Sequence, residues 1–396
     1  MNHGTPVGLL RSRRDGAARV TYFELFFDLV FVYAVTQLSH RLLKDLTVTG
    51  AAETLLLLLA VWWAWMYTSW TTNWFNPDHP AVRLVLIAAM LSGLLMSAAL
   101  PEAFGNRGLW FAGGYVAIQV GRTAFATVAT WRHELGPNFQ RIMAWETTAG
   151  VLWLAGAFGD HGARPALWLL ALGLEYVAPW VGYRFPGLGR STTAHWTIDG
   201  SHMAERCQLF VIIALGESLL VTGSTFAGQK DMGAGAVTAF AVAFLGSVAM
   251  WWIYFDRSAE AAATRIANAD DPGRLGRSAY TFSHVPLVAG IIVTAVADEL
   301  VVAHPGGHMT GGTATVVLGG PALFVAGHAL FKRAVFGHFT AARVLALGTL
   351  AVLAPVSMLL SPLVLAFLTL AVLGALAGWE VLGRRARTPV VAEETA

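Results

Sequence analysis

Acidic side chains occur inside a segment that is apolar enough to cross a lipid bilayer. The stretch from Tyr22 to His40 consists largely of Phe, Leu, Val and Ala, yet it contains Glu24 and Asp28. A charge at membrane depth is costly, so such residues usually face the interior of a helix bundle or a water-filled cavity. The two acids are four residues apart and share one helix face. This pattern indicates a polar site that binds a cation, a proton or a small solute.

A second segment repeats the first. The stretch from Met203 to Leu220 aligns with it without a gap at an offset of 180 residues. Asp28 then falls on Gln208, and Gln37 falls on Glu217, so Asp28 and Glu217 each correspond to a neutral amide. We predict that the site lies between the two copies and uses six side chains: Glu24, Asp28, Gln37, Gln208, Glu217 and His284.

Structural interpretations of the same residues remain open. Glu24 can pair with Arg19 at the membrane interface, and the deeper acids can hold helices together through buried hydrogen bonds. His202 and Glu205, three residues apart, have a spacing that can hold a metal, but an ion network at the end of a helix is the simpler interpretation. We therefore predict no metal site, no cofactor and no catalytic residue, and we assign four residues to structural ion networks: Glu205, Arg206, Arg122 and Glu146.

The composition is that of an integral membrane protein. Of the 396 residues, 56% are hydrophobic and 13% are charged, whereas soluble domains have about 25% charged residues. Fifteen Trp and 22 Phe suit membrane interfaces and lipid-facing surfaces. The single cysteine, Cys207, excludes an intrachain disulfide. The predicted fold class is all-α and polytopic.

Apolar runs of about 20 residues predict twelve transmembrane helices. They lie near 21–42, 51–72, 82–101, 109–131, 139–158, 165–184, 203–222, 233–255, 280–302, 313–332, 341–360 and 362–382. The alternative count merges the last two spans and gives eleven. The first helix of each half is polar on two sides, so we expect it to be central, with neighbours all round.

The basic residues predict the topology. With twelve spans and an internal N-terminus, 20 of the 26 Lys and Arg residues fall in inner segments, five fall in outer segments and Arg122 lies within a span. Cytoplasmic loops of membrane proteins typically carry such an excess of Lys and Arg over the loops on the other side. Eleven spans would put Arg384, Arg385 and Arg387 outside. We therefore predict a multi-pass protein of the plasma membrane with both termini in the cytoplasm.

Further matches extend the duplication along the chain. Trp62 and Trp63 correspond to Trp251 and Trp252, and other pairs follow in the same order at slowly changing offsets. Chance matching in apolar sequence is the alternative. Six helices in each half would make a parallel repeat. The predicted parts are a cytoplasmic segment, a first repeat, a cytoplasmic linker, a second repeat and a disordered cytoplasmic tail, at 1–20, 21–184, 185–202, 203–382 and 383–396.

Two specific stretches resemble the bacterial low temperature requirement A (LtrA) family. They are E-L-F-F-D-L-V-F-V-Y-A-V-T-Q-L-S from Glu24 to Ser39 and H-M-A-E-R-C-Q-L-F-V-I-I-A-L-G-E-S from His202 to Ser218. The runs that begin at His284 and Gly327 resemble weaker signatures of the family. The resemblance implies a polytopic membrane protein whose family name records a growth phenotype rather than a chemistry. Cys207 departs from the family, where an aromatic residue is usual.

Several function classes lack their residues in this sequence. No phosphate-binding G-x-x-x-x-G-K-[ST], H-E-x-x-H, G-x-S-x-G or C-x-x-C motif is present. A membrane-embedded lipid-modifying enzyme would have to use His195, Asp199, His202 and Glu205. A sensor or scaffold for membrane state is suggested by the family's name alone. A solute or ion transporter or channel is favoured, because the repeat and the polar groups at depth suit it.

The first segment also resembles, more faintly, the first helix of potassium channels with six-helix repeats. Phe27 stands where those channels have Ser, and Gln208 replaces the Asp in the second copy. A cation pore therefore stays a hypothesis. The expected partners are the lipid bilayer, an unknown small solute or cation and, as an open option, further copies of the chain. No nucleic acid is expected.

Overall fold

The computed structural model describes residues 8–11, 19–159, 162–193, 196, 198–229, 232–256 and 258–385. Within these ranges the chain is helical and contains only isolated β-bridges, with no extended strand. The all-α prediction is therefore confirmed for the described part of the chain. Most of the N-terminal segment and the tail beyond Arg385 lie outside it, as does His195. The chain divides into two compact units, which are described separately.

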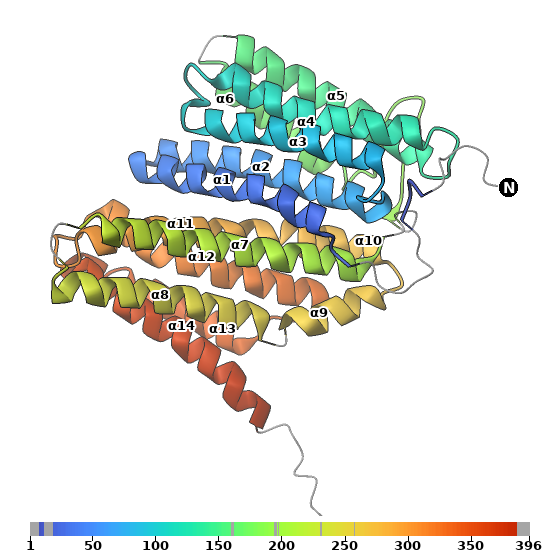
Figure 1. The fold of residues 1–396 in the computed structure, drawn as a ribbon. Helices are drawn as coiled ribbons and strands as arrows, with labels where there is room; N and C mark the ends of the chain where they lie inside the picture. The colour runs from blue at the N-terminus through green and yellow to red at the C-terminus, as the bar shows by residue number, and fades with distance from the viewer. Residues whose placement is uncertain are drawn as a thin grey trace, which may run out of the picture. The chain divides into compact units, whose positions relative to one another are not determined.

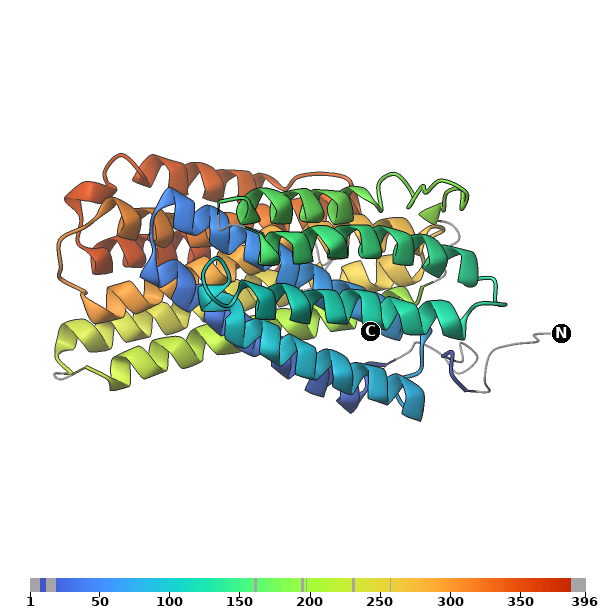
Figure 2. The same cartoon turned by 90° about the horizontal axis from the view of Figure 1, so that it is seen from above.

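The first unit contains the chain up to Glu217 and the stretch Ala262–Val285. Its helices are α1 (Tyr22–Lys44), α2 (Val48–Trp74), α3 (Pro80–Ala99), η1 (Leu100–Glu102), α4 (Gly108–Ala129), α5 (Gly136–Phe158), α6 (Arg164–Val177), the first part of α7 (Gly200–Ala227), α10 (Pro272–Leu275) and the π-helix η3 (Gly276–Phe282). Consecutive helices of the series α3 to α6 pack against each other, and α1 packs on α2 and α3 (Figure 1). These helices run lengthwise beside one another (Figure 2).

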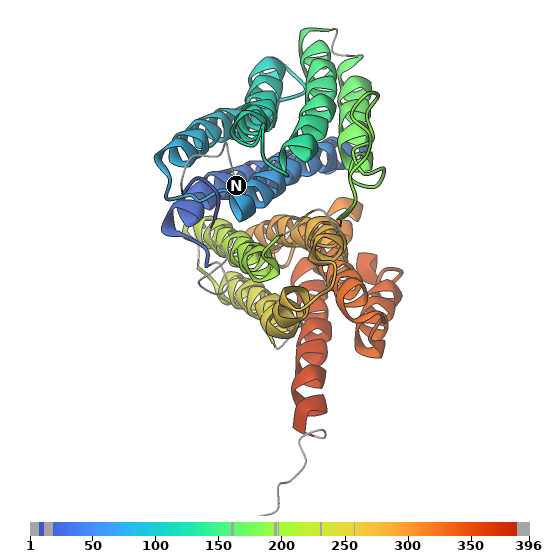
Figure 3. The ribbon, with the colours of Figure 1, turned by 90° about the vertical axis from the view of Figure 1, so that its right-hand side faces the viewer.

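Helix α2 forms the core of the first unit. It contacts α1, α4 and α6, and Figure 3 shows these helices from one end. Trp62, Trp63 and Trp65 are among the largest fully buried side chains of the described chain. A helix that is apolar on all sides is buried on all sides. The close spacing of its aromatic residues thus places α2 at the centre.

Helix α1 is not enclosed on every side, so the expectation that it is central was wrong. Its buried face carries Glu24, Asp28 and Phe31, whereas Phe26 and Leu29 are more than half exposed. The exposed residues recur at the spacing of one helix face. The polar groups of α1 therefore lie inward, and an apolar stripe is left for lipid.

The second unit contains Ser218–Ala261 and the chain from Pro286 onward. Its helices are the end of α7, α8 (Ala234–Phe255), the start of α9 (Ser258–Ala267), most of α11 (His284–Ala303), α12 (Gly311–Phe336), α13 (Ala341–Leu353), η4 (Ser357–Leu359) and α14 (Pro362–Arg385). Helix α14 packs on α8, α12 and α13. Gly337, at a φ of 85°, ends α12 in the left-handed conformation that glycine adopts without strain.

Eight helices of the described chain are long and apolar enough to cross a membrane. They are Tyr22–Lys44, Val48–Trp74, Pro80–Glu102, Gly200–Ala227, Ala234–Ala267, Pro272–Ala303, Gly311–Phe336 and Pro362–Val381. Four predicted spans, those near α4, α5, α6 and α13, do not reach this standard. Helices α6 and α13 have only 14 and 13 residues, and α4 and α5 are less apolar because polar side chains interrupt them.

Candidate functional site

The start of α1 fixes the first acidic side chain of the site. Thr21 caps the helix: its hydroxyl accepts a hydrogen bond from the Glu24 backbone N–H at 3.3 Å, and the Glu24 carboxylate accepts one from the Thr21 N–H at 2.9 Å. This reciprocal arrangement is a capping box. It holds Glu24, which is fully buried, with its second carboxylate oxygen turned toward α7.

Basic and imidazole side chains surround Glu24. Its Oε1 lies 2.9 Å from His202 Nε2 and 3.5 Å from Arg206 Nη1, and its Oε2 lies 2.8 Å from Arg11 Nη2. Val20 N–H donates to Glu205 at 3.1 Å, so Glu205 holds the chain that leads into α1. The described residues show no ion pair between Glu24 and Arg19 or between Glu205 and Arg206; Arg206 faces α1 instead.

Arg11 is brought to the site by backbone hydrogen bonds between its own segment and residues that are distant in sequence. The Arg11 N–H donates to the Trp74 carbonyl and the Asn76 N–H donates to the Leu9 carbonyl, both at 2.9 Å. The segment thereby lies along the end of α2. Arg11 Nε also donates to the Thr72 carbonyl at 2.6 Å, which directs the guanidinium toward Glu24. Sequence reasoning missed this residue, because no local pattern marks such pairing.

Asp28 and Arg206 form the deeper part of the site. Arg206 Nη2 lies 2.6 Å from Asp28 Oδ1, and Trp65 Nε1 donates to the same oxygen at 2.7 Å. Arg206 also donates to Ser69 at 3.1 Å, and both members of the ion pair are fully buried. Asp28 Oδ2 and Arg206 Nε have no hydrogen-bond partner among the described residues. The ion pair is thus buried with part of its hydrogen-bonding capacity unused.

The hydrogen bonds around His202 define its tautomer. Asn73 is oriented by two bonds to the Asp199 backbone, each 2.8 Å long, so its amide nitrogen faces His202 Nδ1 at 3.1 Å. Nδ1 must then accept, and Nε2 carries the hydrogen that it donates to Glu24 at 2.9 Å. Arg11 Nη2 also lies 3.2 Å from Nε2, and in this tautomer it is a neighbour of that nitrogen and not its hydrogen-bond donor. A neutral His202 leaves two guanidinium groups, of Arg11 and Arg206, against two carboxylates. The charges cancel, as a buried cluster requires.

Asp199 has a structural role that explains its position before α7. Its carboxylate accepts hydrogen bonds from the backbone N–H groups of Ser201 and His202, at 3.0 and 3.1 Å. This is the contact that a capping Asp makes at the start of a helix. The described part of the chain holds no group of three or more His, Cys, Asp or Glu side chains that could bind a metal.

Glu217 lies farther along the same pair of helices. It is 9% exposed and accepts a hydrogen bond from the Thr36 hydroxyl of α1. Gln37 is half-buried and adjoins this contact in sequence, and Gln208 is half-buried two residues after Arg206. The structure thus brings Glu24, Asp28 and Glu217 to one line of contact between α1 and the first part of α7. We call this line the α1–α7 seam.

His284 lies apart from the seam, after the π-helix. It is fully buried and its Nδ1 contacts the Ala279 carbonyl at 3.0 Å. Its ring is parallel to that of Trp62, with centroids 6.4 Å apart. Trp62 in turn contacts Trp65 at 5.1 Å, the residue that bonds Asp28. Aromatic packing through Trp62 and Trp65 therefore connects His284 with the residues around Asp28.

A second buried network joins α4, α5 and α6. Arg122 lies 2.7 Å from Glu146, and both side chains are at most 3% exposed. Arg122 also donates to Gln119 at 2.9 Å, while Tyr115 donates to Glu175 at 2.7 Å. Each charged group in this network has a partner on a neighbouring helix, which fits a role in holding the three helices together.

A known protein family matches this chain over nearly all of the helices described above. Residues 19–378, from the start of α1 into α14, match the family described as bacterial low temperature requirement A protein (LtrA). The chain belongs to the LtrA family. It is also 41% identical over 327 residues to the uncharacterised protein RA0937 of Rhizobium meliloti (strain 1021), with 82% of this chain and 80% of that protein covered.

In this LtrA protein the two specific sequence stretches are the two sides of the seam. Glu24 and Asp28 come from the first stretch, and His202, Arg206 and Glu217 come from the second. Sequence reasoning missed Arg11, Trp65 and Asn73. An Asn inside an apolar segment was the one available signal for Asn73, since a buried amide needs partners.

Proposed function

We propose that this LtrA protein is a cation- or proton-dependent solute transporter or channel, and that it is not an enzyme. The observation that carries the proposal is the contact between Glu217 and Thr36. Among the described residues the Thr36 hydroxyl is the hydrogen-bond partner of Glu217, which lies within a helix long and apolar enough to cross a membrane. The acids nearer the start of α1 are instead neutralised by arginines. An ionisable residue such as Glu217 is by default a functional candidate.

The seam offers a route for a cation in steps. Asp28 and Thr36 are eight residues apart on α1, and Arg206 and Glu217 are eleven apart on α7, so each pair is separated by two to three turns at about 3.6 residues per turn. Glu24 and Asp28 accept a cation only when an arginine moves aside. Glu217 accepts one directly, because its other oxygen has no hydrogen-bond donor among the described residues. We infer that Glu217 binds and that the arginine-paired acids control access.

We also propose twelve spans arranged as two six-helix repeats. The four helices that are too short or too polar to qualify as candidate spans, α4, α5, α6 and α13, support this proposal. Each of them packs either on a candidate span or on another of the four. Two helix contacts of the first half have counterparts in the second half. The contact of α2 with α6 corresponds to that of α8 with α14, and the contact of α4 with α5 corresponds to that of α12 with α13. Both halves also bury a charge cluster among their last three helices, and the second uses Arg343 and Glu380, 2.8 Å apart.

Twelve spans predict that both chain ends face the cytoplasm of the bacterium. A green fluorescent protein fused after Ala396 should be fluorescent, and alkaline phosphatase at the same place should be inactive. A fusion of each reporter in the segment 103–107, between η1 and α4, is the matched control and should give the opposite pattern. Phosphatase activity at the C-terminus would rule out twelve spans.

Replacement of Glu217 by Gln is expected to reduce cation flux. A hydrogen bond or contact to a charged group contributes about 1.5–3 kcal/mol, so loss of the carboxylate should slow flux about tenfold or more. The full chain in proteoliposomes would be measured with gradients of H⁺, Na⁺ and K⁺ and entrapped dyes for each ion. Glu102→Gln, at an exposed carboxylate, is the control that should keep wild-type flux.

Two outcomes would contradict the transport proposal. One is a wild-type protein that moves none of the three ions at any pH tested. That result would favour a sensor or scaffold. The other is a folded Glu217→Gln variant with wild-type flux. Size-exclusion profiles of all variants must match, because only a folded protein tests the role of the carboxylate.

A further inference from the structure

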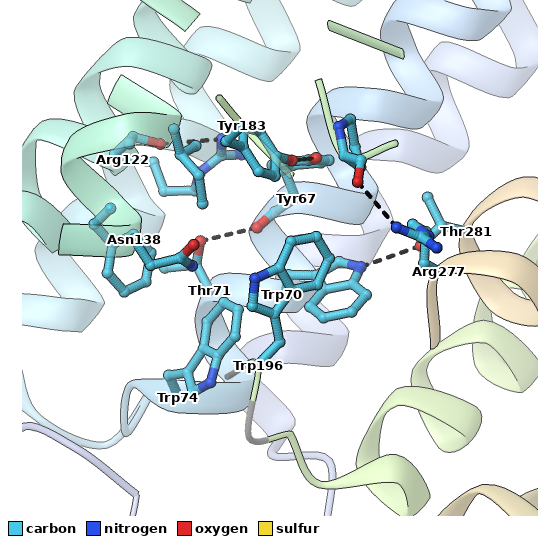
Figure 4. A pocket seen from close by; sticks show the side chains of 14 residues that line it. Tyr67, Trp70, Thr71, Trp74, Arg122, Asn138, Tyr183, Trp196, Arg277 and Thr281 are labelled. Atoms are coloured by element: carbon cyan, nitrogen blue, oxygen red, sulfur yellow. Dashed lines mark hydrogen bonds between the residues drawn. The ribbon is translucent and has the colours of Figure 1, made fainter. Parts of the chain in front are cut away.

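A small cavity lies in the first unit, away from the seam. Its volume is about 30 Å³, and its walls come from α2, α4, α5, η3 and the segment from Pro179 to Trp196 (Figure 4). Aromatic rings make up much of the wall, among them Trp70, Trp74 and Phe139. The hydroxyls of Tyr67 and Tyr183 are hydrogen-bonded to each other at its edge. The cavity is thus shaped by rigid side chains.

The lining carries positive charge and no carboxylate. Arg122 and Arg277 both line the cavity, and its fourteen lining residues include no Asp or Glu. Arg122 is neutralised from behind by Glu146 at 2.7 Å. Arg277 donates to the Pro179 carbonyl at 2.9 Å and lies 4.7 Å from the Trp180 ring, but it forms no ion pair with any described carboxylate. Arg277 is half-buried, so part of a guanidinium group without a carboxylate in direct contact faces the cavity.

Two buried polar atoms of the lining have no partner among the described residues. They are Arg277 Nε, a donor, and Asn138 Oδ1, an acceptor. Asn138 is only 8% exposed, and Figure 4 shows its amide turned toward the middle of the lining residues. A buried polar group without a partner is costly. Arg277 Nε therefore indicates a ligand that accepts a hydrogen bond, and Asn138 Oδ1 indicates a molecule that donates one.

The volume limits what this ligand can be. A water molecule needs at least about 10–15 Å³ of such space, so the cavity holds about two particles of that size. A halide or nitrate ion with one water fits, and a sugar or an amino acid does not. The ligand is therefore a small inorganic ion with a water molecule, and not an organic solute.

We propose that the cavity binds one small monovalent anion, held by the guanidinium group of Arg277, together with a water molecule that donates to Asn138. The bound anion would neutralise Arg277 and fasten η3 to the segment 179–196. This site does not depend on the transport proposal, and either can fail without the other.

Anion-dependent melting of the purified full chain tests the site. The apparent melting temperature would be measured in detergent at constant ionic strength while chloride, bromide or nitrate replaces gluconate, which is too large for the cavity. The wild type should gain several degrees with the saturation of a single site. Arg277→Gln should lose this gain, and Arg274→Gln, which removes an exposed cation of the same segment, should keep it.

A second variant keeps the test decisive if Arg277→Gln does not fold. Asn138→Leu fills the cavity with apolar atoms and should also remove the saturable gain. The proposal is overturned if the wild type melts at the same temperature in chloride and gluconate. It is equally overturned if a folded Arg277→Gln or Asn138→Leu variant keeps the wild-type response, because the anion would then act elsewhere.

Discussion

Replacement of Arg206 by Ala is expected to lower the free energy of unfolding by about 3–5 kcal/mol, the usual cost of leaving a buried charge without its partner. Arg206 lies 2.6 Å from Asp28 and 3.5 Å from Glu24, and all three side chains are fully buried. Its removal leaves one guanidinium, that of Arg11, against two carboxylates. Chemical unfolding in detergent, followed by Trp fluorescence, measures the change.

Two comparisons isolate the buried charge as the cause. Arg83→Ala removes an arginine from an exposed pair with Asp78, whose side chains are 48% and 62% accessible, and exposed pairs contribute about 0–1 kcal/mol. Asp28→Asn combined with Arg206→Met removes both charges of the buried pair and should recover much of the lost stability. An Arg206→Ala protein as stable as Arg83→Ala would show that the network is hydrated or dispensable.

The sequence contained enough information for the acids of the site but not for their partners. Glu24, Asp28 and Glu217 stand out because carboxylates are rare in apolar segments, and the chain indeed buries them. Their partner Arg206 was visible too, yet its proximity to Asp28 depends on how α7 packs on α1, which no local pattern records. Arg11 depends on backbone bonds between residues 9–11 and 74–76, which are equally non-local.

The burial of the helices could be predicted only in part. The exposed stripe of α1, with Phe26 and Leu29, has ordinary helical periodicity and could have been recognised from the spacing of its aromatic residues. Helix α2 has no such stripe, since nearly all its residues from Leu56 onward are buried, and a segment without periodicity gives no direction. Trp65 and Asn73 were therefore indistinguishable from the residues around them.

Close packing of α11 and α12 in the second unit leads to the other large effect that we expect. A Cβ atom added at Gly320 would lie 2.6 Å from the Thr294 backbone nitrogen, and one at Gly290 would lie 2.3 Å from the Phe324 backbone nitrogen. Backbone atoms cannot move aside as a flexible side chain does. Glycines that let two helix backbones approach closely are characteristic of membrane helix pairs, and here they form the contact itself.

Gly320→Ala should therefore destabilise the protein, whereas Gly319→Ala should not. Alanine favours a helix by about 0.8–1.0 kcal/mol over glycine, and Gly319 has open space where its Cβ would be, so that substitution should be neutral or stabilising. At Gly320 the gain is outweighed, because overpacking costs about 1–3 kcal/mol and more where the obstacle is backbone. The two neighbouring substitutions thus have opposite expected signs, which the same unfolding measurement resolves. Equal stability of the two variants would mean that α11 and α12 are not in backbone contact at Gly320.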